Sequence, residues 1–289
     1  MDRAGGQLSG PAIDWGRPWF APWRACGEQV ADRVDAGVAL HEALNAERGA
    51  PVRFVPQQAL PAGRAYEHFI RGSGDCPVRP GLHDFFNGLC WLAMPLTKAR
   101  LNQLQAAQIE ERGVGAVRGP VRDAITLFDE NGALLDAPPE LWAALVQRDW
   151  RGLFVELRPL WRHARLLVFG HALLEKLAAP RKELTAHVWR FPIAIAIGSV
   201  AAADNHLSSQ LTPELLAVKP FVPLPLLGIP GWWPENGDDS FYDDAQVFRP
   251  RRVITDNNST PCDPAPPLIS TGRSASAAQG NFTTLSESS

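Results

Sequence analysis

The chain has few cysteines, little excess charge of either sign and no long apolar run. Its four cysteines, at positions 26, 76, 90 and 262, show no Cys-X-X-Cys spacing, which favours a reducing compartment. The first ten residues contain no apolar signal-peptide core. The longest apolar run, Phe191–Ala203, is too short and too interrupted by Pro and Gly to cross a bilayer. We therefore expect a cytoplasmic protein with no membrane partner.

Several common motifs are also missing. The chain has no GxGxxG, GxxxxGK[ST], GxSxG or HExxH pattern, which removes the usual nucleotide-binding, serine-hydrolase and zincin interpretations. The formal net charge is -3, from 28 basic and 31 acidic side chains, and no block of like charge occurs. Because dedicated nucleic-acid binders are usually basic, a nucleic-acid partner is not expected.

What the sequence does contain is enough apolar material for a large core. Hydrophobic residues make up 45% of the 289 positions, with ten Trp and thirteen Phe. We expect a flexible segment over 1–14, a single globular domain over 15–252, and a disordered tail over 253–289, where Ser, Thr, Asn, Pro and Ala predominate. The Pro-rich, aromatic segment 219–250 cannot be regular helix and is expected to wrap the surface of this domain.

The expected fold class is α+β, with helices dominant around a small sheet. That sheet should include a β-hairpin over 124–135, since the β-rich run Ala124–Phe128 precedes an Asp-Glu-Asn-Gly turn at 129–132 and a second short run. In such a strand Asp123 shares a face with apolar residues, which would require a cation nearby. Arg122, a histidine or a metal ion are the candidates.

The segment Leu82–Lys98 is predicted to contain a buried helix with one polar stripe, which Pro95 ends. His83, Asn87 and Trp91 follow a spacing of i, i+4, i+8, and Asp84 lies beside them at the helix start. Two interpretations stay open. Asp84 caps the helix while His83 and Asn87 bond to backbone groups, or His83 and Asp84 ligate a metal or act as general acid and base while Asn87 and Trp91 bind a ligand.

A third group of candidates follows an apolar strand. Gly170 ends the run 166–169 and precedes a helix, which places His171 at a helix amino terminus, where a neutral imidazole is favoured. His171 and Glu175 share a helical face, and a simple surface contact between them is the alternative to ligand binding. His187 lies further along the chain as another possible ligand.

The motifs HDFFNGLCWLAMPLTKARLN, RDAITLFDENG, GHALLEKL and GIPGWWPENGDDSFYDD together resemble the bacterial domain of unknown function 3025 family over about Trp15 to Arg252. The resemblance implies no fold, activity or cofactor. It implies that several candidate residues belong to recurring motifs, namely His83, Asp84, Asn87, Arg122, Asp123, His171, Glu175 and His187.

The leading functional hypothesis is a metal-dependent hydrolase acting on a small phosphoester or amide, with a divalent ion as cofactor. The predicted catalytic residues are His83, Asp84, Arg122 and Asp123; the predicted binding residues are Asn87, Glu175 and Trp91; the predicted metal ligands are His83, Asp123, His171 and His187. The alternatives are a non-enzymatic small-molecule-binding or scaffold protein with a buried polar network, and a nuclease-like phosphodiesterase, which the near-neutral charge disfavours. The sequence does not identify the substrate.

Overall fold

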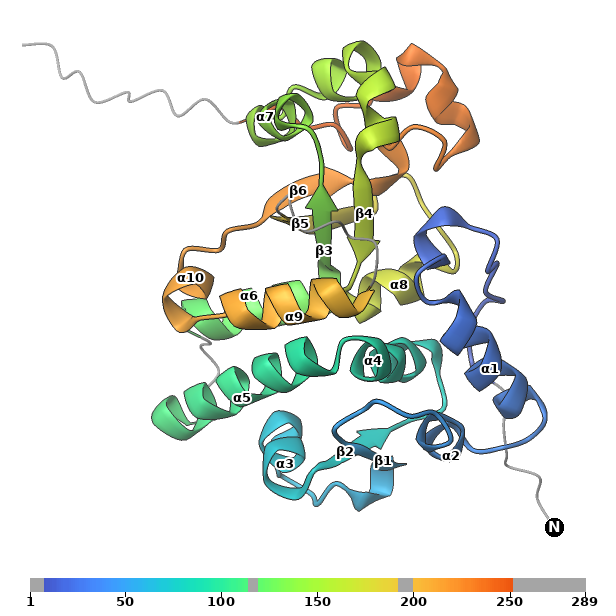
Figure 1. The fold of residues 1–289 in the computed structure, drawn as a ribbon, viewed down its shortest axis with the longest axis vertical. Helices are drawn as coiled ribbons and strands as arrows, with labels where there is room; N and C mark the ends of the chain where they lie inside the picture. The colour runs from blue at the N-terminus through green and yellow to red at the C-terminus, as the bar shows by residue number, and fades with distance from the viewer. Residues whose placement is uncertain (1–7, 114–118, 192–199, 252–289) are drawn as a thin grey trace, which may run out of the picture. The chain divides into compact units, whose positions relative to one another are not determined.

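The computed structural model describes residues 8–113, 119–191 and 200–251. Helices predominate around two small sheets (Figure 1). The α-helices are α1 (Arg24–Asp35), α2 (Leu40–Asn45), α3 (Tyr66–Ser73), α4 (Leu82–Ala93), α5 (Pro95–Arg112), α6 (Pro120–Asn131), α7 (Pro139–Gln147), α8 (His171–Leu177), α9 (Val200–Gln210) and α10 (Pro213–Ala217). The strands are β1 (Arg53–Pro56), β2 (Asp75–Val78), β3 (Gly132–Asp136), β4 (Arg165–Val168), β5 (Thr185–Arg190) and β6 (Val222–Pro225).

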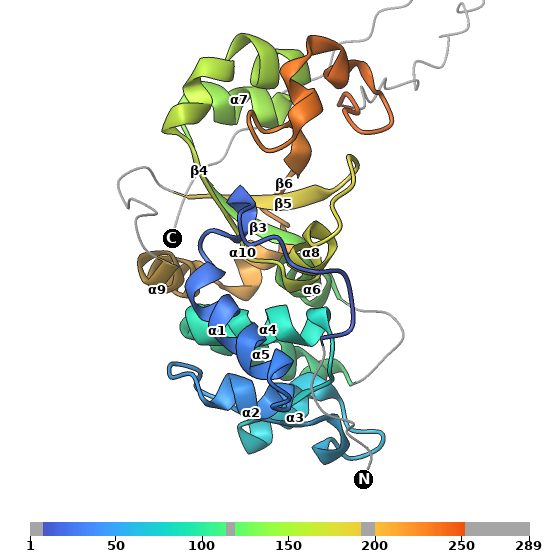
Figure 2. The same ribbon diagram turned by 90° about the vertical axis from the view of Figure 1, so that its right-hand side faces the viewer.

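The two sheets lie on either side of the central helices (Figures 1 and 2). Strands β1 and β2 pair in parallel, with α2 and α3 packed on them. The larger sheet has the order β4-β3-β5-β6, in which β3 runs antiparallel to β4 and parallel to β5. Helices α4, α5, α6 and α8 pack on one another between the sheets. The fold class is therefore α+β, a single helix-dominated domain, as the sequence predicts.

Helix α4 is buried along most of its length, as its apolar sequence predicts. Ten of its residues are buried, among them Phe85, Phe86 and Cys90. Gly88 allows α2 to approach, because a Cβ at this position would lie 2.5 Å from a methyl carbon of Leu44. The helix ends before Pro95, the first residue of α5.

The amino terminus of α5 is closed by a side chain from a distant helix. The amides of Leu96 and Thr97 donate to the carboxylate of Asp204 in α9, at 3.0 and 2.7 Å. Asp204 is buried, so these two bonds satisfy helix-terminal amides that would otherwise be unpaired. The contact fixes the position of α5 beside the other central helices.

The predicted β-hairpin over 124–135 is wrong. Residues 120–131 form helix α6, with Pro120 in its first turn, and Gly132 begins strand β3 instead of closing a turn. The buried residues Val121, Ala124, Ile125 and Phe128 are spaced i, i+3, i+4, i+7, which is helical periodicity. Strand β3 joins the larger sheet through partners far away in sequence.

The structure describes most of the amino-terminal segment and the Pro-rich segment 219–250, but not the tail after residue 251. Residues 8–14 are described, and the hydroxyl of Ser9 donates to the carbonyl of Pro80 at 2.8 Å. The segment 219–250 forms β6 and short 3-10 turns at Leu226–Gly228, Pro234–Gly237 and Asp239–Asp243, with no long helix. The tail predicted over 253–289, including Cys262, lies outside the described residues.

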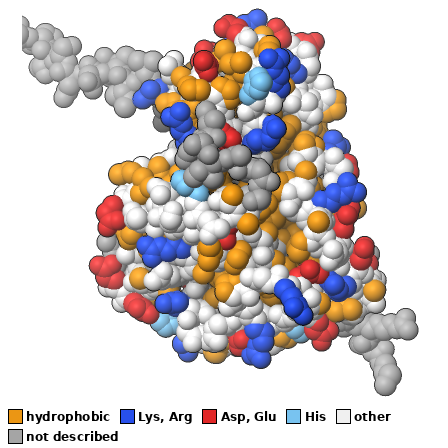
Figure 3. All heavy atoms as spheres, viewed as in Figure 1, with side chains coloured by type: hydrophobic (Ala, Val, Ile, Leu, Met, Phe, Trp, Pro, Cys, Tyr) orange, Lys and Arg blue, Asp and Glu red, His pale blue; other side chains and the backbone are white. Residues whose placement is uncertain are grey.

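The cysteines, the apolarity of the helices and the surface charge bear on the expected environment of the protein. Cys26, Cys76 and Cys90 are free thiols. Among the described residues, no helix combines the length and apolarity that a membrane crossing requires. On the face shown in Figure 3, basic and acidic side chains are interspersed without a large patch of either sign.

Candidate functional site

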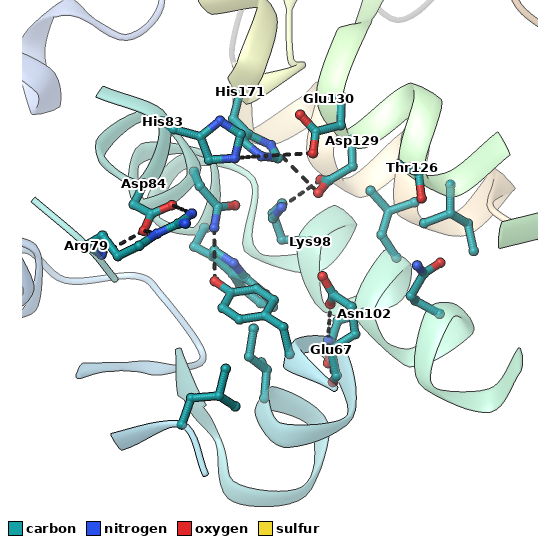
Figure 4. Close-up of a pocket in the computed structure, with 18 of the residues that line it drawn as sticks. Glu67, Arg79, His83, Asp84, Lys98, Asn102, Thr126, Asp129, Glu130 and His171 are labelled. Carbon is teal, nitrogen blue, oxygen red and sulfur yellow. Dashed lines mark hydrogen bonds and ion pairs between the residues drawn. The ribbon is translucent and has the colours of Figure 1, made fainter. Parts of the chain in front are cut away.

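A cavity of about 340 Å³ opens between α3 and the central helices. Residues of α3, α4, α5 and α6 line it, together with Arg79 from the loop before α4 and His171 from α8 (Figure 4). All four polar-stripe residues of the predicted helix line this cavity: His83, Asp84, Asn87 and Trp91. Their functional roles stay predictions.

Two histidines and one carboxylate meet at the upper wall of the cavity in Figure 4. His83 lies in the first turn of α4, and His171 is the first residue of α8. Their Nε2 atoms are 3.2 Å apart, and Oε1 of Glu130 lies 3.7 Å from Nε2 of His171. The potential ligand atoms of His83, Glu130 and His171 all lie within 4.8 Å of one another. We call these three residues the metal-ligand trio.

Gly170 makes this meeting possible. A Cβ at Gly170 would lie 2.5 Å from the backbone oxygen of Glu130 and 2.5 Å from the backbone nitrogen of Asn131. The start of α8 therefore contacts the end of α6 directly, with no room for a side chain. This contact places His171 beside Glu130.

Each imidazole has a carboxylate on its other nitrogen. Nδ1 of His83 lies 3.0 Å from Oε2 of Glu175, and Nδ1 of His171 lies 3.7 Å from Oδ2 of Asp129 and has no side-chain hydrogen-bond partner among the described residues. Metal-binding histidines commonly present their second N–H to a carboxylate in this way. The predicted surface contact between His171 and Glu175 is replaced by a contact of both residues with His83.

Asp129 also holds a buried lysine. Nζ of Lys98, a 5% exposed residue, donates to Oδ1 of Asp129 at 2.6 Å and lies 5.5 Å from the ring centroid of Trp91. Burial alone would lower the pKa of Lys98, but Asp129, with smaller contributions from Cys90 and Glu67, holds the pKa above its usual value. Burial likewise opposes ionisation of Asp129, yet Lys98 and His171 hold its pKa below the usual value. The two groups form a charged pair.

His171 is held in its neutral form. Burial lowers the pKa of His171 to about 4; the carboxylate of Asp129 opposes this shift, while Lys98 and His83 add to it. The sequence predicted a neutral imidazole from the helix amino terminus, whereas burial is the main cause. Neutral imidazole is the form that binds a metal ion.

The lower wall of the cavity in Figure 4 carries a further carboxylate, that of Glu67. Oε2 of Glu67, in α3, accepts a hydrogen bond from Nδ2 of Asn102 in α5 at 2.5 Å. Burial raises the pKa of Glu67, and the nearby Asp129 charge raises it further. Figure 4 places Lys98 between this pair and the metal-ligand trio.

Asp84 is bound by the loop before its own helix. Its carboxylate accepts from the backbone amide and the guanidinium of Arg79, at 2.6 to 3.2 Å. Asp84 is 5% exposed, so these bonds compensate its burial at the start of α4. Asp84 does not belong to the group of residues whose potential ligand atoms lie within 4.8 Å of one another.

Four predicted residues do not line the cavity: Arg122, Asp123, Glu175 and His187. Because 120–131 is a helix, Asp123 points to solvent from α6, 4.0 Å from Nζ of Lys219, and the apolar strand face predicted for it does not exist. Arg122 is buried on α6, and its Nε has no hydrogen-bond partner in the described part of the chain. His187 belongs to β5, where burial lowers its pKa. The predicted ligand set is therefore brought together only in part, at His83 and His171.

Sequence reasoning missed Glu130, Asp129, Lys98 and Glu67. Asp129 and Glu130 were assigned to a turn, although continuing the helical spacing of Ala124 and Phe128 would have placed them in the last turn of a helix. No local signal marks Glu67 or Lys98, because their burial depends on how α3, α5 and α6 pack.

The fold and the cavity define a helix-dominated α+β protein with a histidine and carboxylate cluster of the kind that holds divalent ions. The chain belongs to the family described as Protein of unknown function (DUF3025), whose model matches residues 52–252. The match ends where the motif resemblance ends but begins at Val52 instead of near Trp15. No curated protein and no solved structure matches the chain.

Proposed function

We propose that this protein is a metal-dependent hydrolase of a small substrate, with a divalent ion held by His83, His171 and Glu130. The observation that carries the proposal is the 3.2 Å separation of the two Nε2 atoms, each on an imidazole that presents Nδ1 to a carboxylate. Two nitrogens that each lie about 2.0 to 2.1 Å from a tetrahedral zinc ion are about 3.3 Å apart. The two distances agree.

The positions of the protons support the same conclusion. A hydrogen bond between the two Nε2 atoms needs a proton on one of them. If His83 donates from Nδ1 to Glu175 and is neutral, His171 must donate from Nε2, which leaves a bare Nδ1 facing the carboxylate of Asp129. An ion between the Nε2 atoms lets both imidazoles keep a proton on Nδ1, facing Glu175 and Asp129.

The surrounding residues fit hydrolytic chemistry. A divalent ion with three protein ligands and an open position supplies an activated water and polarises a carbonyl or phosphoryl oxygen. Lys98 places a fixed positive charge beside the trio, where it would stabilise negative charge that develops on the substrate. Arg79 and Asn87 would orient the substrate from the wall formed by α4 and its preceding loop.

The test is metal binding together with hydrolysis. We expect the purified full chain to bind about one zinc equivalent, measured by elemental analysis and calorimetry, and to hydrolyse members of a panel of small esters, amides and phosphoesters. His171→Ala and Glu130→Gln should each lower zinc affinity by about tenfold or more and abolish zinc-dependent turnover. His163→Ala, at an exposed histidine away from the cavity, is the matched control. Zinc affinity that is equal in all three variants would refute the proposal.

A second candidate is a non-enzymatic binding or scaffold protein. It is favoured by the direct contact between the two imidazoles, because a positively charged His83 could donate to Glu175 and to His171 and complete a polar network with no ion. In that case the full chain would bind no zinc, and His171→Ala would lose folding stability instead of turnover.

A further inference from the structure

The residues that line the lower wall of the cavity carry hydrogen-bond acceptors with unused capacity in the described structure. Glu67 accepts from Asn102 through Oε2, and no Lys or Arg forms an ion pair with Glu67 in the described part of the chain. Gln105, which also lines the cavity, is 9% exposed, and its Oε1 has no hydrogen-bond partner among the described residues. Both residues thus bring an acceptor to this wall without a cation or a full set of donors among the described residues.

Asn87 adds a third acceptor whose orientation is fixed by its neighbour. The hydroxyl of Tyr66 donates to the carbonyl of Pro77 at 3.2 Å, so it can only accept from Asn87, whose Nδ2 lies at 3.3 Å. The amide oxygen of Asn87 is thus the free end. This residue is 6% exposed, and Oδ1 has no partner in the described structure. A buried acceptor without a donor costs about 1 to 3 kcal/mol, which a bound donor would recover.

The charges of the cavity leave one carboxylate without a partner. Arg79 pairs with Asp84 and Lys98 pairs with Asp129, so both cationic side chains that line the cavity are already bound. A divalent ion in the metal-ligand trio would compensate Glu130. Of the carboxylates that line the cavity, Glu67 then lacks a positive charge in contact with it among the described residues.

We infer that Glu67 is the anchor of a subsite that binds a protonated primary amine of the substrate, in a cavity whose wall also carries Asn87 and Gln105. That the bound amine belongs to a substrate that is hydrolysed rests on the proposed function. The binding of the amine does not. An ammonium group supplies the positive charge that Glu67 lacks, and its three N–H groups can donate to this carboxylate and to other acceptors nearby. The substrate class is then a small ester, amide or phosphoester that carries a free amine on the side away from the hydrolysed bond.

The electrostatics of Glu67 agree with this assignment. Burial and the charge of Asp129 raise the pKa of Glu67 because its ionised form lacks a contacting cation. An ammonium group at hydrogen-bond distance would favour the ionised carboxylate. Asn102 would hold the carboxylate in place for it.

The experiment uses calorimetry on the full chain with three probes of one size: n-butylamine, n-butanol and butyrate. Each probe is titrated into the zinc-loaded protein and into protein kept in a chelator. We expect butylamine to bind in both forms, and butanol and butyrate to bind at least about tenfold more weakly. Glu67→Gln should weaken butylamine on the order of tenfold and leave zinc affinity unchanged. Glu140→Gln, at an exposed glutamate of α7, is the control.

The outcomes separate the two proposals. Amine binding without zinc binding would refute the metal site and leave the amine subsite standing; zinc binding without amine binding would do the reverse. Butyrate binding as tight as butylamine binding, or butylamine affinity that Glu67→Gln does not change, would overturn the subsite. Butylamine binding that needs zinc and survives Glu67→Gln would also overturn it, since the amine would then be a metal ligand.

Discussion

The protonation state of one partly buried carboxyl group, that of Glu67, depends on which cation lies beside it. In the described structure its nearest polar contact is the amide of Asn102, and Lys98 is bound to Asp129 instead. Burial therefore dominates and its pKa is raised. A raised pKa in the folded state means that folding favours the protonated form, so Glu67 contributes stability below its unfolded pKa of about 4.3 and loses that contribution as the pH rises through the folded value.

This sign leads to a prediction about stability. Without amine or metal, the free energy of unfolding of Glu67→Gln relative to the wild type should increase as the pH rises from about 4 to 8, since the variant keeps a neutral side chain at every pH. Urea denaturation at pH values across that range measures the difference. A wild type that gains stability relative to the variant as the pH rises would contradict the prediction.

Individual residues also show what the sequence could and could not reveal. His83 and His171 were found because imidazoles stand out in apolar segments next to helix starts. Glu67 and Lys98 look like ordinary surface residues of amphipathic helices, and only the packing of α3, α5 and α6 buries them. Local sequence carries no information about such contacts between distant helices.

At the level of elements, the contact between the end of α6 and the start of α8 determines the site. The sequence predicted the strand, glycine and helix around His171 correctly, because an apolar run, a glycine and a helical pattern follow one another. It assigned 124–128 to a strand because β-branched and aromatic residues occur there, whereas the spacing of the buried residues is helical. That single error moved Asp123 into the predicted site and removed Glu130 from it.

The close approach at Gly170 can be tested directly. Gly170→Ala adds a methyl group where backbone atoms lie 2.5 Å away, so α8 must shift from α6. We expect the variant to lose about 1 to 3 kcal/mol of stability and to bind zinc at least about tenfold more weakly, because His171 moves from Glu130. Chemical denaturation and calorimetry measure the two effects.

Gly237→Ala is the matched control, since a Cβ there meets no atom within 4 Å and the backbone is not left-handed. It should behave like the wild type in both measurements. Gly170→Ala protein with wild-type zinc affinity would show that the contact between α6 and α8 does not position the metal-ligand trio.

On the scale of the whole molecule, the trio joins segments that are far apart in the chain, at positions 83, 130 and 171. An ion bound to all three would connect α4, α6 and α8 in the folded state only. At a free zinc concentration of about one hundred times Kd, linkage stabilises the folded state by about 2.7 kcal/mol.

We therefore expect zinc to raise the Tm of the full chain by about 5 °C or more, reversibly with a chelator. The same addition should leave the Tm of His171→Ala nearly unchanged, while His163→Ala should respond like the wild type. Differential scanning calorimetry with and without zinc measures each shift. An equal rise in Tm for His171→Ala would place the ion elsewhere.

The bond between Asp204 and the first turn of α5 has a consequence for the order of folding. Every residue that lines the cavity precedes position 172, yet the carboxylate that closes the helix carrying Lys98 and Asn102 is synthesised more than thirty residues later. During translation, the backbone amides of Leu96 and Thr97 in the first turn of α5 thus lack this acceptor until α9 emerges from the ribosome. Completion of the pocket is tied to the arrival of the carboxyl-terminal third of the chain.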